Sequence, residues 1–189
     1  MKNNINKTLI EVVNSFKRIN SPDIEEGIHD SYNLMIKALK NKKKIIFCGN
    51  GGSAADSQHL AAELVGKYKY FRQAIPALSI TCDTSAITSI GNDMGFEHIF
   101  SRQIEAVGES GDILFAMSTS GTSKNILNAI IAAKKKKIKL IFLKSQLLKK
   151  KIDLCDIIIK VPSIRVDRIQ EMHISIGHII CELIETKFK

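Results

Sequence analysis

The chain has 189 residues, of which 44% are hydrophobic and 25% charged, the proportions of an ordinary globular domain with a sizeable core. No apolar run approaches the ~20 residues that span a bilayer, and the N-terminal stretch lacks the apolar segment of a signal peptide. The net charge of +9 comes largely from lysine runs at 40–44, 134–139 and 149–151. These runs lack interleaved aromatic residues and any nucleic-acid motif, so we expect a solvated lysine surface and neither nucleic acid nor membrane as a partner.

Four cysteines, at positions 48, 82, 155 and 181, lie far apart and form no C-x-x-C pair. Three of them fall in apolar runs of the kind that become strands or helices. This spacing favours reduced thiols over a disulfide framework or a zinc knuckle, and predicts a cytoplasmic protein.

The first two elements in the chain are predicted helices over about residues 4–19 and 22–41, the second with Ser21 as N-cap and Pro22 at its first position. Short apolar runs then alternate with helical segments. The predicted strands are 44–49, 76–82, 111–118, 138–144 and 155–162. The predicted helices between and after them are the segment that carries His59 and Glu63, then 83–93, 95–108, 123–136 and 166–185.

Strands that are apolar throughout and separated by helices predict a parallel sheet covered on both faces. The expected fold class is therefore α/β, with a single doubly wound five-stranded parallel sheet flanked by helices and preceded by an N-terminal helical hairpin. We divide the chain into N-terminal helices, residues 1–42, and the sheet domain, residues 43–189, which together form one compact unit.

Two strand ends carry sequences of a kind that binds anions. Asn50-Gly51-Gly52-Ser53 follows the first strand and opens a helix, whose free N–H groups and positive dipole end attract negative charge. Residues 118–123 follow the third strand and place five hydroxyls around one glycine, more than a helix cap requires. No lysine or Mg²⁺-binding aspartate accompanies them in the pattern of a nucleotide loop. These segments therefore predict a site for a sugar phosphate monoester.

His59 and Glu63 are four residues apart and share one face of their helix. Such a pair is most often simply hydrogen-bonded, and His178, in an apolar helix, would by default be a core or interface histidine. The same groups could instead move a proton between adjacent carbons of a sugar, or hold a metal ion with mixed nitrogen and oxygen ligands. The ordinary interpretation is the only one for the other histidines, which are His29, His98 and His173.

Four segments together resemble a known family. They are CGNGGSAADSQHLAAEL (48–64), GNDMGFEHIFSRQIEAVG (91–108), GDILFAMSTSGTSKN (111–125) and VDRIQEMHISIGHIICELIE (166–185). In order and spacing they are similar to the phosphoheptose isomerase branch of the sugar isomerase (SIS) domain family, over about residues 5–187. The resemblance implies the SIS fold, a homotetramer, and conversion of sedoheptulose 7-phosphate into D-glycero-D-manno-heptose 7-phosphate through an enediol. That product supplies heptose for bacterial lipopolysaccharide or capsule.

The resemblance also implies roles for individual residues. The catalytic pair is Glu63 and His178. The implied substrate contacts are Asn50, Gly51, Gly52, Glu63, Asn92, Asp93, Ser118, Thr119, Ser120, Ser123 and Gln170. The implied ligands of one Zn²⁺ per subunit are His59, Glu63, Gln170 and His178, with Asp167 as a further polar residue of the site. The segment 143–151, LKSQLLKKK, departs from the glycine-rich loop of the family and leaves fine substrate preference open.

Two other functions stay open. Some relatives are non-catalytic binding modules, such as the bacterial DnaA initiator-associating protein, in which the positions of Glu63 and His178 carry other residues. Arabinose 5-phosphate isomerase is another SIS enzyme, but it lacks the C-terminal DRIQEMHI sequence in this form. The presence of both residues favours the heptose isomerase.

Helix geometry adds one expectation. On one straight helix the Cα atoms of Gln170 and His178 are ~12 Å apart along the axis and rotated by ~80°. Both can bind one ion only if Gln170 lies in a non-helical turn, if the helix is distorted, or if the two come from different chains. One stripe of this helix is broad and apolar enough to pack against a partner, and it comprises Ile169, Met172, Ile176, Ile179, Ile180 and Leu183. We therefore expect active sites at the subunit interfaces of a homotetramer.

Overall fold

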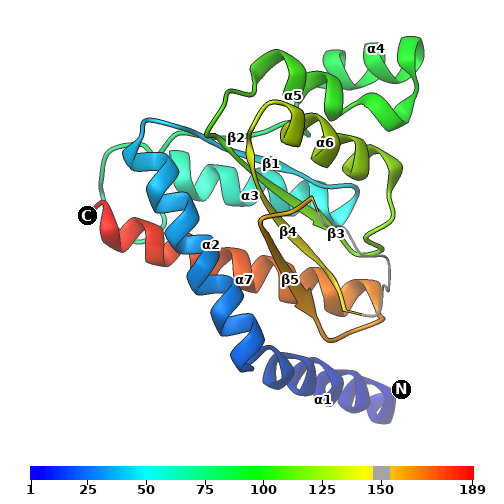
Figure 1. Ribbon diagram of the computed structural model, residues 1–189. Coiled ribbons are helices and arrows are strands. Elements are labelled where there is room, and N and C mark those ends of the chain that lie inside the picture. Colours follow the sequence, from blue (N-terminus) through cyan, green and yellow to red (C-terminus); the bar gives the residue numbers. More distant parts are fainter. Residues whose placement is uncertain (147–153) are drawn as a thin grey trace.

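The computed structural model describes residues 1–146 and 154–189, so positions 147–151 of the departing segment lie outside the described residues. The elements follow the predicted order (Figure 1). The helices are α1 (Lys2–Ile19), α2 (Pro22–Lys40), α3 (Gly52–Val65), α4 (Thr84–Met94), the short 3₁₀ helix η1 (Phe96–His98), α5 (Ser101–Val107), α6 (Lys124–Lys135) and α7 (Val166–Lys187). The strands are β1 (Ile45–Cys48), β2 (Ala77–Ser79), β3 (Ile113–Ser118), β4 (Lys139–Ser145) and β5 (Ile157–Val161).

The strands form one parallel sheet in the order β2-β1-β3-β4-β5, which confirms the predicted five-stranded sheet. Every residue of β1 and β3 is buried, and this explains why both segments are apolar throughout. The chain leaves β1 toward β2 on one side and later returns to β3 on the other. The strand order therefore reverses between β1 and β3, and in open α/β sheets ligands bind at the carboxyl ends of the strands at such a point.

Helices cover both faces of the sheet (Figure 1). On one face α2, α3 and α7 bury a large apolar cluster that includes Met35, Leu60 and Met172. On the other face α5 and α6 bury a second cluster that includes Ile104 and Ile130. Two separate cores on opposite faces confirm the doubly wound architecture.

The two N-terminal helices behave differently. Helix α2 begins at Pro22 after the extended residue Ser21, as predicted, although the Ser21 side chain makes no capping hydrogen bond. It packs into the first core, so the predicted division at residue 42 separates elements that share one apolar cluster. Helix α1 turns away from α2 and from the body (Figure 1). Its apolar stripe is left 38–58% exposed, at Ile5, Leu9, Ile10, Val13 and Phe16.

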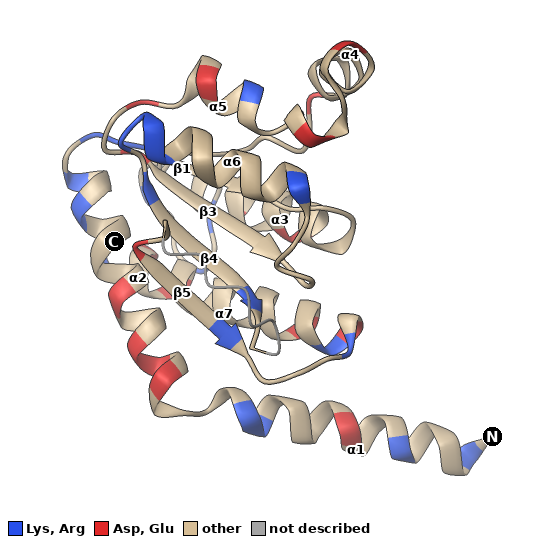
Figure 2. Cartoon of the chain, turned by 45° about the vertical axis from the view of Figure 1, so that its right-hand side comes forward, with Lys and Arg blue, Asp and Glu red and all other residues tan. Residues whose placement is uncertain are grey.

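The first two lysine runs lie where α2 leads into β1 and where α6 leads into β4 (Figure 2). Both junctions are at the amino ends of the strands, so this positive charge lies at the edge of the sheet opposite to the carboxyl ends. Lysines here also suit the negative ends of the two preceding helix dipoles. The position favours the interpretation as a solvated surface.

Among the described residues, no helix combines the length and the apolar character needed to cross a bilayer. The four cysteines are free, with Cys48 and Cys181 buried. Burial raises the pKa of both of these thiols to about 12. Neither is therefore ionised near neutral pH.

Candidate active site

The turn after β1 has the geometry of an anion-binding loop. Gly51 is the N-cap of α3 and has a φ of 56°, a left-handed conformation that favours glycine. A side chain on Gly51 would meet no other atom within 4 Å, so the turn opens to solvent. The N–H groups of Ser53 and Ala54 donate to the carbonyl oxygens of Asn50 and Gly51, both at 3.0 Å, and close the first turn of α3. The positive end of the helix dipole still points at this turn and favours an anion there.

The serine cluster, comprising Ser118, Ser120 and Ser123, forms the second loop. Their three Oγ atoms lie 3.3–3.5 Å from one another. The Ser118 Oγ accepts the N–H of Gly121, and Gly121 has a φ of 63° that turns the chain back toward α6. Three hydroxyls that converge at a helix N-terminus fit the oxygens of one phosphate group.

A pair of amide side chains joins the two loops. Asn50 Nδ2 donates to Asn125 Oδ1 at 2.9 Å, and Asn125 Nδ2 donates to Asn50 Oδ1 at 2.7 Å. Asn125 is only 3% exposed. The Asn50 side chain, a predicted substrate contact, is therefore occupied by this pairing. No sequence pattern indicated a role for Asn125, since its partner lies 75 positions away.

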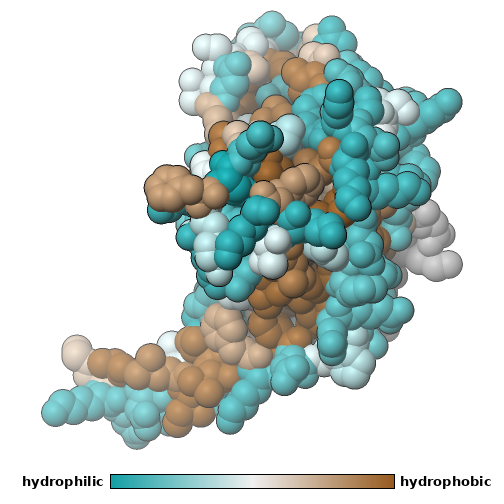
Figure 3. All heavy atoms as spheres, turned by 90° about the vertical axis from the view of Figure 1, so that its left-hand side faces the viewer, coloured by the Kyte–Doolittle hydropathy of each residue, from teal (hydrophilic) through white to brown (hydrophobic). Residues whose placement is uncertain are grey.

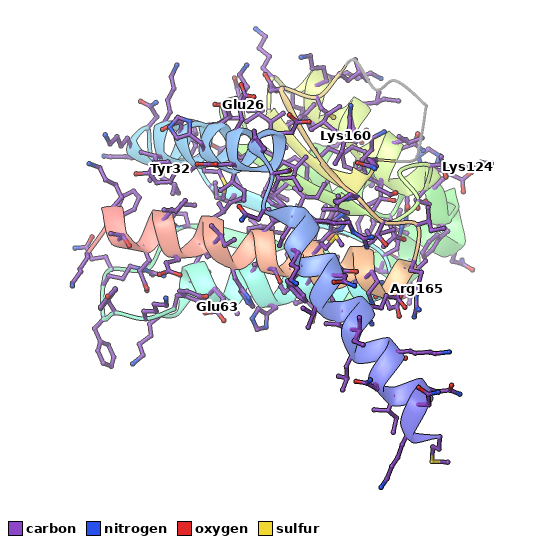
Figure 4. The ribbon with its side chains drawn as sticks, turned by 90° about the horizontal axis from the view of Figure 1, so that it is seen from below. Glu26, Tyr32, Glu63, Lys124, Lys160 and Arg165 are labelled. Carbon is purple, nitrogen blue, oxygen red and sulfur yellow. The ribbon has the colours of Figure 1, made fainter. Side chains whose placement is uncertain are left out.

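An open hollow of about 290 Å³ lies beside these loops and is lined by Asn50, Phe96, Glu97, Ser123, Lys124 and Asn125. Lys124 follows the serine cluster directly and is exposed (Figure 4). Lys124 does not belong to a nucleotide-loop pattern, but it lines the same hollow as Ser123. Its ammonium group supplies the charge that a phosphate dianion requires.

The metal-binding cluster, comprising His59, Glu63 and His178, lies further along α3 where that helix packs against α7. His59 Nε2 lies 2.9 Å from His178 Nε2 and 3.1 Å from Glu63 Oε1. One ligand atom from each of the three residues lies within 4.8 Å of the other two. Glu63 is 22% exposed at its side chain, so the carboxylate is partly shielded from water. The structure thus brings together residues that are 119 positions apart.

The donor set of the metal-binding cluster fits a zinc ion. Ligands about 2.0–2.1 Å from a tetrahedral zinc ion are about 3.3 Å apart, close to the two short separations in the cluster. Two imidazoles and one carboxylate leave a fourth position for substrate or another ligand, as in catalytic zinc sites. Burial lowers the pKa of His178, the nearby His59 adds to this and Glu63 opposes it. A lowered pKa favours the neutral imidazole that a metal ion needs.

Gln170 does not join the metal-binding cluster within one chain. Helix α7 runs unbroken from Val166 to Lys187, so Gln170 and His178 stay ~12 Å apart along its axis. The Gln170 amide instead packs on Gly52, where any Cβ would overlap it. Gln170 and His178 could therefore bind the same ion only if the two residues came from different chains.

Three other predicted residues lie elsewhere. Asn92 and Asp93 are exposed in the last turn of α4, where the Asn92 amide donates to the Asp93 carboxylate at 2.7 Å. Asp167 pairs with Arg165 and Arg168 at the start of α7, and the hydrogen bond from Arg165 holds the pKa of Asp167 well below its usual range. Among the described residues, none of these three forms a hydrogen bond or ion pair with the metal-binding cluster.

The other histidines follow the ordinary interpretation. His173 is fully buried in the core, and burial lowers its pKa to about 3. His29 and His98 are exposed on the surface.

Comparison with known proteins gives a consistent result. The family model of the SIS domain matches residues 9–145. A phosphoheptose isomerase of Nitratiruptor is 49% identical over 188 residues and covers 100% of both chains, and that of Akkermansia muciniphila is 45% identical over 98% of this chain and 97% of its own. The structure of the phosphoheptose isomerase of Neisseria gonorrhoeae superposes with a TM-score of 0.89 at 36% identity, covering 98% of each chain. That of Francisella tularensis gives 0.91 at 32% identity and covers 97% of each.

This chain belongs to the phosphoheptose isomerase family. The assignment confirms the resemblance that the four segments indicated and the SIS fold that it implied.

The metal-binding cluster depends on a close approach of α3 and α7. Gly177, directly before His178, faces Leu60, directly after His59, and a Cβ on Gly177 would lie 2.5 Å from Leu60 Cδ1. Leu60 is fully buried, so its side chain would have to shift within the core to make room for a Cβ. The glycine at 177 therefore favours the close approach of the two helices.

We expect Gly177→Ala to lower the melting temperature by about 5 °C, since overpacking costs ~1–3 kcal/mol and the better helix propensity of alanine offsets up to ~1 kcal/mol. The matched control is Gly91→Ala in α4, where a Cβ would meet only Ile99 Cγ2 at an ordinary 3.8 Å. Thermal unfolding followed by circular dichroism measures both. Equal melting temperatures for the two variants would show that α3 and α7 do not need the glycine.

Proposed function

We propose that this protein converts sedoheptulose 7-phosphate into D-glycero-D-manno-heptose 7-phosphate. The observation that carries the proposal is the coexistence of two half-sites on one fold, the serine cluster for a phosphate and the metal-binding cluster with a carboxylate and two imidazoles. The relatives that are named phosphoheptose isomerases match over the full length of the chain. A non-catalytic binding module does not need an acid–base pair, so the grouping of Glu63 and His178 favours an enzyme.

Glu63 is the base of the proposed reaction. Its carboxylate takes a proton from C1 of the ketose, the C1–H electron pair forms the C1=C2 bond of an enediol, and the carbonyl oxygen at C2 gains a proton. Returning a proton to C2 while the C1 hydroxyl loses its own gives the aldose, and no electron acceptor is needed. The neutral imidazole of His178 is placed to exchange protons with the two sugar oxygens.

Zn²⁺, one per subunit, is part of the proposal. When bound, the ion would polarise the sugar carbonyl and stabilise negative charge on the enediolate oxygen. His59, Glu63 and His178 would hold it. If Glu63 is a metal ligand, its second oxygen is the one free to act as base.

The distance between the half-sites favours a site shared by two copies of the chain. Gly52 follows Asn50, whose amide pair with Asn125 joins the first loop to the second, and its Cα atom is ~16 Å from that of Glu63 along the axis of α3. At roughly 1.2 Å per bond of an extended chain, a heptose phosphate spans only about 10 Å. Figure 4 likewise shows Glu63 well apart from Lys124 beside the serine cluster. The lean of the Glu63 side chain toward the start of α3 closes this gap only in part.

An exposed apolar surface supports a homotetramer. Figure 3 shows apolar residues along α1 that continue into a hollow on the body. This groove of about 660 Å³ lies between α2 and α7, and among its lining residues are Ile24, Ile28, Tyr32, Ile176, Ile179 and Leu183. The expectation about the α7 stripe needs correction, because Ile169, Met172, Ile176 and Ile180 pack in the chain's own core. Only Ile179 and Leu183, at 41% and 40% exposure, are left for a partner.

Several finer points stay predictions. They are the cytoplasmic location, the use of the product in lipopolysaccharide or capsule, and the roles of Asn92, Asp93 and Gln170 at the substrate. The absence of nucleic acid and membrane partners is likewise an expectation from composition. Thr119, partly exposed beside the serine cluster, keeps its predicted contact with the phosphate.

Glu63→Gln should lower kcat by ~10² or more, since the amide keeps the size of the side chain but cannot accept the C1 proton. Aldose formation from sedoheptulose 7-phosphate measures it. The matched control is Glu105→Gln, which removes an exposed carboxylate paired with Arg102 and should leave kcat unchanged. Near-normal turnover of Glu63→Gln would remove this residue from the mechanism.

Replacing Ser120 and Ser123 together by alanine should mainly raise KM, by about 10-fold or more, because phosphate contacts change little between substrate and transition state. Isothermal titration with the substrate and with dephosphorylated sedoheptulose checks the assignment. The unmutated protein should bind the dephosphorylated sugar poorly. If both sugars bind equally well, the serine cluster holds something other than phosphate.

Mixing Glu63→Gln with Ser123→Asp protein, after dissociation and reassembly, should restore activity. Some sites in the mixed oligomers would combine the unmutated serine cluster of a Glu63→Gln copy with the unmutated metal-binding cluster of a Ser123→Asp copy. Mixing Glu63→Gln with His178→Ala is the control. It should stay inactive, since both residues belong to one chain's cluster. If mixed oligomers of the first pair form but show no activity, both half-sites of each active site belong to one chain.

A further inference from the structure

The loop between α3 and β2, residues 66–76, is fixed by one buried carboxylate. Glu185, near the end of α7, is 1% exposed. Its two oxygens accept the backbone N–H groups of Tyr68 at 2.9 Å, Lys69 at 2.6 Å and Tyr70 at 3.3 Å. Three successive amides around one carboxylate satisfy a buried charge that would otherwise be costly.

Arg72 links this carboxylate to the end of α3. Its Nε lies 3.3 Å from Glu185 Oε1, and its side chain is 1% exposed. The guanidinium donates to the carbonyl oxygens of Glu63 at 2.8 Å, Leu64 at 2.9 Å and Gly66 at 3.2 Å. These carbonyls end α3 and lack partners within the helix. Arg72 therefore fixes the backbone of the helical turn that carries Glu63.

Tyr68 connects the loop to the metal-binding cluster. Its ring centroid lies 5.8 Å from that of His178, with the planes inclined by 34°. His178 also contacts the ring of His59, with centroids 4.9 Å apart. The imidazole of His178 thus has an aromatic neighbour from the loop as well as one from α3. Sequence spacing gave no sign of this contact, since Tyr68 and His178 are 110 positions apart.

We propose that Glu185 and Arg72 are positioning residues that hold the loop and the end of α3 so that Tyr68 packs on His178 and Glu63 stays within the metal-binding cluster. The inference deepens the proposed function and rests on it for the catalytic effect, but not for the effect on metal binding. Groups that orient metal ligands typically change metal affinity or activity 10–100-fold when they are removed.

Electrostatics agree with a fixed carboxylate. Burial by itself would raise the pKa of Glu185, but the N–H groups of Lys69, Tyr68 and Tyr70, with Arg72, outweigh it and hold that pKa below its ordinary value. Glu185 is therefore ionised whenever the loop is in place. An amide at this position would point its NH₂ group at backbone N–H groups that need an acceptor.

The first test is Glu185→Gln. It should lower the affinity for Zn²⁺ by about 10-fold, measured by competition with a chelator in the absence of any sugar. It should also lower kcat about 10-fold with little change in KM, and speed amide hydrogen exchange at residues 68–70. Glu182→Gln is the matched control. Glu182 lies on the same helix, and its exposed carboxylate pairs with the Lys69 side chain and not with the loop backbone. The Glu182→Gln variant should therefore change none of these values.

The second test is a pair of substitutions at Tyr68, which stays informative even if Glu185→Gln fails to fold. Tyr68→Leu removes the ring from His178 and should reproduce the 10-fold losses in zinc affinity and kcat. Tyr68→Phe keeps the ring and should recover most of both. Melting temperatures of the two variants show whether either loss comes from global destabilisation.

Zinc affinity and kcat of Tyr68→Leu within about twofold of the unmutated protein would overturn the inference. So would equal losses in Tyr68→Leu and Tyr68→Phe, because the ring would then not be the group that matters. If zinc affinity falls as expected but the unmutated protein shows no isomerase activity, the proposed function fails while the positioning role holds. If the unmutated protein is active but Tyr68→Leu leaves zinc affinity and kcat unchanged, the positioning role fails while the proposed function holds.

Discussion

The contact between α3 and α7 is the constraint on which the candidate active site depends. Those two helices pack on the same face of the sheet, and Gly177 lets them approach at Leu60. His59 and Glu63 are on one helix and His178 on the other, so only this approach brings their ligand atoms within reach of one ion. A wider gap would leave an ordinary histidine–glutamate pair on α3 and an isolated histidine on α7.

A second constraint comes from the parallel sheet. Because β1 and β3 are neighbours, the loops that follow them emerge side by side at the carboxyl edge. The reciprocal amide pair of Asn50 and Asn125 then fixes one loop relative to the other. The pairing holds the serine cluster in a fixed position, which would lower the entropic cost of binding the proposed phosphate. Helix α7 also contacts this part of the molecule, because the Gln170 amide packs on Gly52.

The two proposed half-sites lie on different elements. The serine cluster directly precedes α6, while the last two turns of α3 carry His59 and Glu63, which meet His178 of α7. The proposed shared site therefore requires a second copy of the chain to bring the two half-sites together. The exposed stripe of α1 and the groove between α2 and α7 offer apolar surface for such an assembly.

The sequence by itself determined the order of elements, the parallel sheet, the doubly wound layers and the anion-binding loops, because each depends on local periodicity, on glycine or on a run of hydroxyls. Resemblance added the family and the set His59, Glu63 and His178, which spacing alone would have left as ordinary residues. Only the tertiary structure decided that Gln170 packs on Gly52, that most of the α7 stripe is core, and that Lys124 lines the hollow beside the serine cluster. It also revealed Asn125, Arg72 and Glu185, whose partners are distant in sequence. Their roles arise from hydrogen bonds between segments that the folded chain brings together, and no local pattern encodes those contacts.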